Sequence, residues 1–100
     1  MTYIEQHSGE IKKLCVLHNV KTLYAFGSVV SDRLTEKSDI DFIVDFGNVD
    51  IEEYADNYFN FKFSMQDILK RPVDLIEEKA IKNPYFKQVV KAQRKLVYGH

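Results

Sequence analysis

The chain has 100 residues, 45% of them hydrophobic and 29% charged, with 14 basic side chains against 15 acidic ones. This size and balance predict a single globular domain over residues 1–100, without the overall basic field that favours direct nucleic-acid binding. Cys15 is the only cysteine and no apolar run reaches membrane-spanning length, so we expect no intramolecular disulfide, no membrane partner and a reducing, cytoplasmic setting.

The amino-terminal part of the chain predicts a helix, a strand and a turn. Apolar side chains recur at helical spacing over Thr2 to His18. Thr22 to Phe26 is typical of a short strand, and this strand stops at Gly27-Ser28. Beyond the turn the pattern is mixed, with Ser31 and Asp32 as candidate caps of a short helix.

The strongest strand pattern covers Ile40 to Phe46, where apolar and polar residues alternate. One predicted face is apolar throughout and consists of Ile40, Phe42, Val44 and Phe46. The opposite face carries Asp41, Ile43 and Asp45. The strand is therefore expected to cover a core with one face and to hold carboxylates on the other.

A long helix is predicted over Ile51 to Leu69, because large apolar side chains recur there at alternating steps of four and three residues. These side chains are Tyr54, Tyr58, Phe61, Met65 and Ile68. Phe59, Phe61 and Phe63 also alternate at strand spacing, which leaves a strand as the alternative. The aromatic surface exceeds what a small sheet needs, so part of it is a candidate patch for a homo-oligomer or another partner.

The carboxyl-terminal part predicts a third strand and a last helix. Lys70-Arg71-Pro72 breaks the long helix, and Val73 to Glu77 follows as a strand that carries Asp74. The last helix is predicted over Pro84 to Tyr98 with Asn83 as its cap. Its predicted apolar stripe consists of Tyr85, Phe86, Val89, Val90, Ala92 and Leu96, and its basic residues are interpreted as a solvated face. This order of elements predicts an α/β (α+β) fold, with a small mixed β-sheet of about three strands flanked by helices.

Three aspartates on two predicted strands form the first candidate site. Asp39 and Asp41 are two residues apart, so they share one face of a strand, about 6–7 Å apart at the backbone. Carboxylates this close repel each other unless a cation or a shared proton relieves the charge. Mg²⁺ takes oxygen ligands of this kind, and Asp74 on the next strand makes the group a candidate three-ligand metal site.

Each of these residues also has a simpler interpretation. Asp39 is then a turn cap, Asp41 a residue of a solvated face, and Asp74 the ion-pair partner of Arg71. The combination with Gly27-Ser28 favours the metal site, since a glycine lets the backbone approach a ligand closely and exposed N–H groups at a turn attract phosphate.

The segments Phe26-Gly27-Ser28, Ser38-Asp39-Ile40-Asp41 and Val73-Asp74-Leu75 together resemble motifs of the nucleotidyltransferase superfamily that includes polymerase beta. In size and layout the chain is similar to the minimal branch of that superfamily, the MNT domains encoded beside HEPN-domain partners in bacteria and archaea. The resemblance covers nearly the whole chain, from Thr22 through the last predicted helix.

The resemblance implies a reaction and a role for each motif residue. Gly27, Ser28 and Ser38 would bind an NTP, with ATP expected. Asp39 and Asp41 would bind two Mg²⁺ ions, and Asp74 would complete one metal site and help to deprotonate the acceptor hydroxyl. The implied reaction transfers AMP to a hydroxyl group and releases pyrophosphate, and the implied role is that of the antitoxin of a HEPN-type toxin.

One stretch departs from the pattern of the family. Many relatives follow the Gly-Ser turn with a run like Arg-Ala-Arg-Gly, whereas this chain has Val29-Val30-Ser31-Asp32. We hypothesise that Arg33 or Lys37 supplies the missing positive charge. The same departure motivates an alternative function, in which a catalytically weak or inactive protein of this fold neutralises its partner by binding alone.

Overall fold

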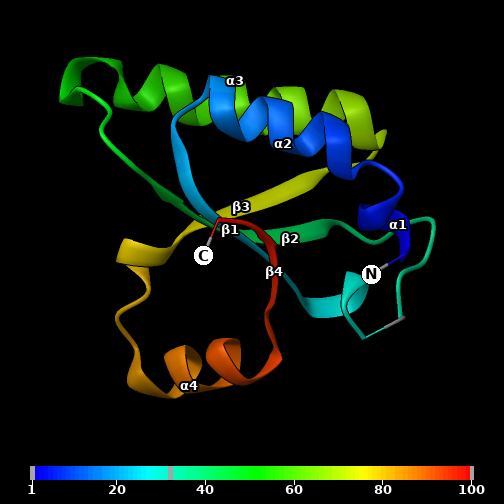
Figure 1. Ribbon diagram of the computed structural model, residues 1–100. Helices are drawn as coiled ribbons and strands as arrows, with labels where there is room; N and C mark the ends of the chain where they lie inside the picture. Colours follow the sequence, from blue (N-terminus) through cyan, green and yellow to red (C-terminus); the bar gives the residue numbers. More distant parts are fainter. Residues whose placement is uncertain (1, 32, 100) are drawn as a thin grey trace.

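The computed structural model describes residues 2–31 and 33–99, which form four α-helices and four strands (Figure 1). The helices are α1 (Thr2–Glu5), α2 (Ser8–Leu17), α3 (Ile51–Leu69) and α4 (Pro84–Gln93), and the strands are β1 (Val20–Phe26), β2 (Ile40–Phe46), β3 (Val73–Glu77) and β4 (Lys95–Tyr98). Two short 3₁₀ turns follow strands, η1 (Gly27–Val29) and η2 (Glu78–Ala80). The predicted cap Asp32 lies outside the described residues.

The strands form one four-stranded mixed sheet in the order β3-β2-β1-β4. β1 is antiparallel to both of its neighbours, β2 and β4, while β2 and β3 run parallel. This confirms the predicted α/β fold with a mixed sheet, and it corrects the number of strands from three to four. In Figure 1, α2 and α3 cover one face of the sheet and α4 lies on the other.

The fourth strand arises because the last predicted helix ends early. α4 stops at Gln93, and the segment that was predicted to continue it forms β4, which pairs with β1 at Ala25↔Lys95 and Leu23↔Tyr98. Without this partner, β1 would expose a row of unpaired N–H and C=O groups at the sheet edge. Val and Tyr also favour strands, so pairing with β1 overrides the helical spacing.

Most of the apolar stripe predicted for the last helix is exposed rather than buried. Val90 is buried, but Tyr85 is 82% exposed and Val89 is 43% exposed. Arg94, predicted on a solvated helix face, instead ends the helix and bonds to Glu78 at 2.8 Å while its guanidinium stacks on the Tyr24 ring at 3.8 Å. The predicted apolar stripe is therefore wrong as a buried face, and the predicted basic helix face is wrong for the segment after Gln93.

The first predicted helix is interrupted between Glu5 and Ser8. The break lies at Gln6 and His7, directly before Ser8 and Gly9, which are poorer helix formers than the residues that follow them. It lets α1 turn toward the end of α3, where the Tyr3 hydroxyl donates a hydrogen bond to the Leu69 carbonyl and Ile4 is buried. The predicted single helix from Thr2 to His18 is thus two helices.

Two hydrophobic clusters lie on opposite faces of the sheet. The larger cluster contains the predicted apolar face of β2, together with Phe61 and Met65 of α3. The smaller cluster contains Ile43 of β2, Val90 of α4 and Ile81 from the segment between η2 and α4. The alternation predicted for β2 is confirmed, and Asp41 and Asp45 share the face of the smaller cluster.

The helix α3 has the predicted bounds, so the strand alternative for its aromatic residues is wrong. Phe61 is fully buried, whereas Phe59 and Phe63 are about half exposed and stack with ring centroids 6.0 Å apart. The helix ends at Lys70 in the left-handed conformation (φ 56°). No helix within residues 2–31 and 33–99 has the length and apolar character needed to cross a membrane.

The cap predicted for the last helix is confirmed and gives a first test of the fold. The Asn83 side chain accepts hydrogen bonds from the N–H groups of Tyr85 at 2.9 Å and Phe86 at 3.2 Å. We expect Asn83→Ala to lower the free energy of unfolding by about 1 kcal/mol, as measured by urea denaturation. An unchanged unfolding midpoint would contradict the capping role.

Candidate active site

The parallel pairing of β2 and β3 brings two of the predicted carboxylates side by side. Asp41 is the direct register partner of Asp74, and neighbouring strands lie about 4.8 Å apart. Asp39 immediately precedes β2 at the same end of the sheet. The structure therefore gathers the three predicted carboxylates where β2 and β3 begin and β1 ends.

The turn after β1 lies directly against this carboxylate group. Phe26, the last residue of β1, pairs with Asp41, and Gly27 follows with a φ of 79°. A Cβ atom at position 27 would lie 2.7 Å from Oδ2 of Asp41. Glycine is thus required here for two reasons, its left-handed backbone and the closeness of the Asp41 carboxylate.

The electrostatics of Asp41 follow from its place at the centre of the group. Burial raises the pKa of its carboxyl group above the ordinary value, and the negative charges of Asp74 and Asp39 raise it further. Asp39 and Asp74 are themselves exposed. Like charges held this close favour the neutral form or the binding of a cation.

The turn η1 is built around the Gly27 carbonyl oxygen. This oxygen accepts hydrogen bonds from the N–H groups of Val30 at 3.0 Å and Ser31 at 3.2 Å, and from the Ser31 hydroxyl at 3.3 Å. The N–H of Arg33 donates to the Ser28 carbonyl at 3.1 Å. The backbone after β1 is therefore tightly folded, although the predicted helix cap at Ser31 is instead part of this turn.

The segment before Asp39 is a separate turn in which Ser38 has a structural role. The Ser38 hydroxyl oxygen accepts a hydrogen bond from the Thr35 N–H at 3.0 Å and lies 3.0 Å from Oγ1 of Thr35. The Arg71 guanidinium donates to the carbonyl oxygens of Thr35 and Ser38. Arg71 thus holds the turn that leads into Asp39, and the alternative ion pair with Asp74 is not formed among the described residues.

A cavity of about 500 Å³ lies beside Gly27. Its lining residues come from the turn after β1, the end of α4 and the start of β4, namely Gly27, Val30, Ser31, Arg33, Ala92, Gln93 and Lys95. Gly27 therefore touches both the carboxylate group and this cavity.

A family model described as polymerase beta, nucleotidyltransferase matches residues 9–100. The chain belongs to this nucleotidyltransferase family. A Methanocaldococcus jannaschii protein named "Putative protein adenylyltransferase MJ0128" is 37% identical over 81 residues, which cover 81% of this chain and 78% of that protein.

Solved structures share the fold of this chain. A chain of a toxin–antitoxin complex crystallised with AMP-PNP superposes with a TM-score of 0.72 at 23% identity, over 93% of this chain and 73% of that one. A chain of a complex between a tri-AMPylated Shewanella oneidensis HEPN toxin and an MNT antitoxin superposes with a TM-score of 0.65 at 22% identity, over 97% of this chain and 73% of that one.

The oxygen donors of Asp39, Asp41 and Asp74 fit Mg²⁺ in chemistry. The carboxylates supply hard oxygen ligands, and Mg²⁺ in such sites is commonly held by one or two carboxylates plus water and substrate phosphates. Within residues 2–31 and 33–99, however, no three or more His, Cys, Asp or Glu side chains are arranged to hold a metal ion. Asp39, Asp41 and Asp74 form an electrostatic group, and their roles as metal ligands stay a prediction.

Sequence reasoning missed Lys95 and the positioning role of Arg71. The sequence pattern predicts Lys95 in the last helix, and only the pairing of β4 with β1 brings it to the cavity beside Gly27. The sequence indicates Arg71 only as part of a helix break or as an ion-pair partner of Asp74. The role of Arg71 follows from the register of β2 and β3, which places the start of β3 beside the turn before β2.

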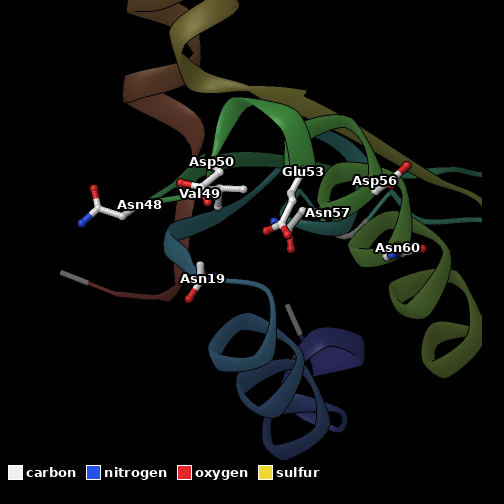
Figure 2. Close-up of a pocket in the computed structure, with 8 residues that line it drawn as sticks. All are labelled: Asn19, Asn48, Val49, Asp50, Glu53, Asp56, Asn57 and Asn60. Atoms are coloured by element: carbon white, nitrogen blue, oxygen red, sulfur yellow. The ribbon is translucent and has the colours of Figure 1, made fainter.

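Another hollow lies at the opposite end of the sheet (Figure 2). It is lined by Asn19, Asn48, Val49, Asp50, Glu53, Asp56, Asn57 and Asn60. Asn19 precedes β1 and Asn48 follows β2, so the length of β2 separates this hollow from Asp41. Figure 2 shows its side chains projecting from the start of α3 and from the two loops.

Proposed function

We propose that this protein transfers AMP from ATP, with Mg²⁺, to a hydroxyl group of a HEPN-domain partner and thereby acts as the antitoxin of that partner. The observation that carries the proposal is the placement of Asp41 between Gly27 and Asp74 at one end of the sheet. The nucleotidyltransferase family and the relative named as an adenylyltransferase support the reaction. The fold shared with toxin–antitoxin complexes supports the partner.

Asp39, Asp41 and Asp74 are the residues that would hold Mg²⁺. When bound, a pair of these ions stabilises the attacking and leaving oxygens of an in-line phosphoryl displacement. Burial raises the pKa of the Asp41 carboxyl group, and repulsion from Asp74 and Asp39 raises it further. A bound cation would relieve that repulsion, so the three carboxylates favour its binding.

Apart from holding the metal ions, the residues of the site would position the nucleotide and the acceptor hydroxyl for reaction. The absence of a side chain at Gly27 leaves space beside Oδ2 of Asp41, and the Ser28 hydroxyl would donate to a phosphate oxygen. The acceptor oxygen forms a bond to the α-phosphorus as the bond to the pyrophosphate oxygen breaks. Asp74, exposed at the start of β3, would accept the proton of the acceptor hydroxyl.

The alternative function is neutralisation by contact alone, and one observation favours it. Val29, Val30 and Ser31 bring no positive charge to the turn that would face the triphosphate. Loss of nucleotide binding would leave the fold and its partner surface in place. The two functions differ in whether the carboxylates are needed.

The experiment that separates them is protection of growing cells that express the HEPN partner. We expect the wild-type protein to protect and the double variant Asp39→Asn/Asp41→Asn to fail, because the transfer reaction is lost. Co-purification with the partner checks that the double variant still binds it. Protection at the wild-type level by the double variant would favour the contact-only function.

A further inference from the structure

Many relatives have a basic run after the Gly-Ser turn, and this chain lacks it. The cavity beside Gly27 contains two basic residues from other positions. Resting on the proposed function, we infer that the triphosphate of the bound nucleotide lies in this cavity and that Lys95 and Arg33 bind its phosphates. Lys95 would thereby connect the carboxyl-terminal strand to substrate binding. This assigns a phosphate-binding role to two residues that line one cavity from different segments of the chain.

The position of the cavity suits a nucleotide that reacts at Asp41. Gly27 lines the cavity, and the site of its absent Cβ is 2.7 Å from Oδ2 of Asp41. A phosphate chain in the cavity therefore meets the carboxylate group at this glycine. The cavity volume of about 500 Å³ also falls in the range of about 300–1,000 Å³ that is typical of small-molecule sites.

The charge of the cavity favours an anion. Its described lining residues include two cations, Arg33 and Lys95, and no carboxylate. Both cations are exposed, and neither takes part in the ion pairs formed between described residues. Their charges are thus available to a ligand, whereas the adjacent Arg94 is already paired with Glu78 at 2.8 Å.

Backbone contacts hold both cations at the cavity. Lys95 pairs with Ala25 in the register of β4 and β1, which sets it beside the strand end that leads into Gly27. The N–H of Arg33 donates to the Ser28 carbonyl at 3.1 Å, so Arg33 is tied to the same turn. Lys37, the other candidate from the sequence, lies in the Thr35–Ser38 turn and is not among the lining residues.

The test is calorimetric titration of the purified full chain with AMP-PNP and, separately, with AMP, both in the presence of Mg²⁺. Lys95→Gln and Arg33→Gln should each weaken AMP-PNP binding about tenfold, the usual effect of losing one charge-assisted hydrogen bond, and leave AMP binding unchanged. Lys95→Arg should restore AMP-PNP binding. Lys91→Gln, an exposed cation of α4 outside the cavity, is the matched control.

The outcomes separate this inference from the proposed function. Wild-type affinity for AMP-PNP in both Lys95→Gln and Arg33→Gln would overturn the inference, and so would an equal loss in Lys91→Gln. Wild-type protein that transfers AMP would still support the proposed function in those cases. A wild-type protein that binds no AMP-PNP would overturn both.

Discussion

Asp41→Asn is expected to lower the rate of AMP transfer about a thousandfold or more. Asp41 lies at the centre of the carboxylate group, between Gly27 and Asp74. An amide has no charge to offer a divalent cation, and metal-assisted phosphoryl transfer draws several kcal/mol of transition-state stabilisation from that cation. A thousandfold loss corresponds to about 4 kcal/mol in activation free energy. The measurement is transfer of radiolabel from α-labelled ATP to the partner.

The same substitution should leave the metal-free fold as stable as the wild type, or more stable. The folded state raises the pKa of the Asp41 carboxyl group, so folding favours its protonated form. The stability that this protonated form contributes is lost as the pH rises through the folded-state pKa, and the ionised form then opposes folding. At neutral pH, replacing the charge by a neutral amide removes that cost. Urea denaturation in the presence of a chelator measures the effect.

Asp45→Asn is the matched control for Asp41→Asn. Asp45 lies on the same face of β2, four residues further along, and it forms an ion pair with the exposed Lys79 at 3.8 Å. Because the Lys79 side chain is 79% exposed, this ion pair contributes little to stability. We expect full transfer activity from this variant. Equal losses in the two variants would show that the activity depends on the strand rather than on the proposed site.

Gly27→Ala is expected to reduce AMP transfer by about a hundredfold while the protein stays folded. The new methyl group would stand 2.7 Å from Oδ2 of Asp41, so the carboxylate has to move. Displacements of about 1 Å at reacting groups cost rates of this size. The backbone φ of 79° adds a strain of about 1–2 kcal/mol for a residue with a side chain.

Gly9→Ala is the control for this prediction, measured by the same transfer assay and by urea denaturation. Gly9 lies in α2, and a Cβ atom at this position would have no neighbouring atom within 4 Å. Alanine there should raise the free energy of unfolding by about 1 kcal/mol without changing transfer. Wild-type transfer by Gly27→Ala would contradict the close packing of Gly27 and Asp41 as a requirement of the site.

The elements that the sequence predicts best are those whose local signals agree. β2, α3 and β3 have the predicted bounds, since β2 alternates its apolar core face with carboxylates, α3 repeats its apolar residues with a helical period and Pro72 breaks the chain before β3. The Asn83 cap follows from the same kind of local signal. Local chemistry and tertiary packing favour the same structure in each of these segments.

The elements that it misses depend on distant partners. β4 forms by pairing with the otherwise open edge of β1. The residues around Lys95 carry no local signal for this distant pairing. The pairing of Asp41 with Asp74 depends likewise on the parallel register of β2 and β3. The motifs therefore predicted which carboxylates gather at one end of the sheet, whereas the cavity and its cations required the assembled sheet.

The central proposal is that AMP is transferred to the partner and that this transfer needs the three carboxylates. The intact mass of the partner tests it most directly. The HEPN-domain product of a neighbouring gene is incubated with ATP, Mg²⁺ and either the wild-type protein or Asp39→Asn/Asp41→Asn. We expect the partner to gain mass in steps of one AMP with the wild type and to gain none with the double variant. An unchanged mass after incubation with wild-type protein that binds both ATP and the partner would contradict the proposed transfer.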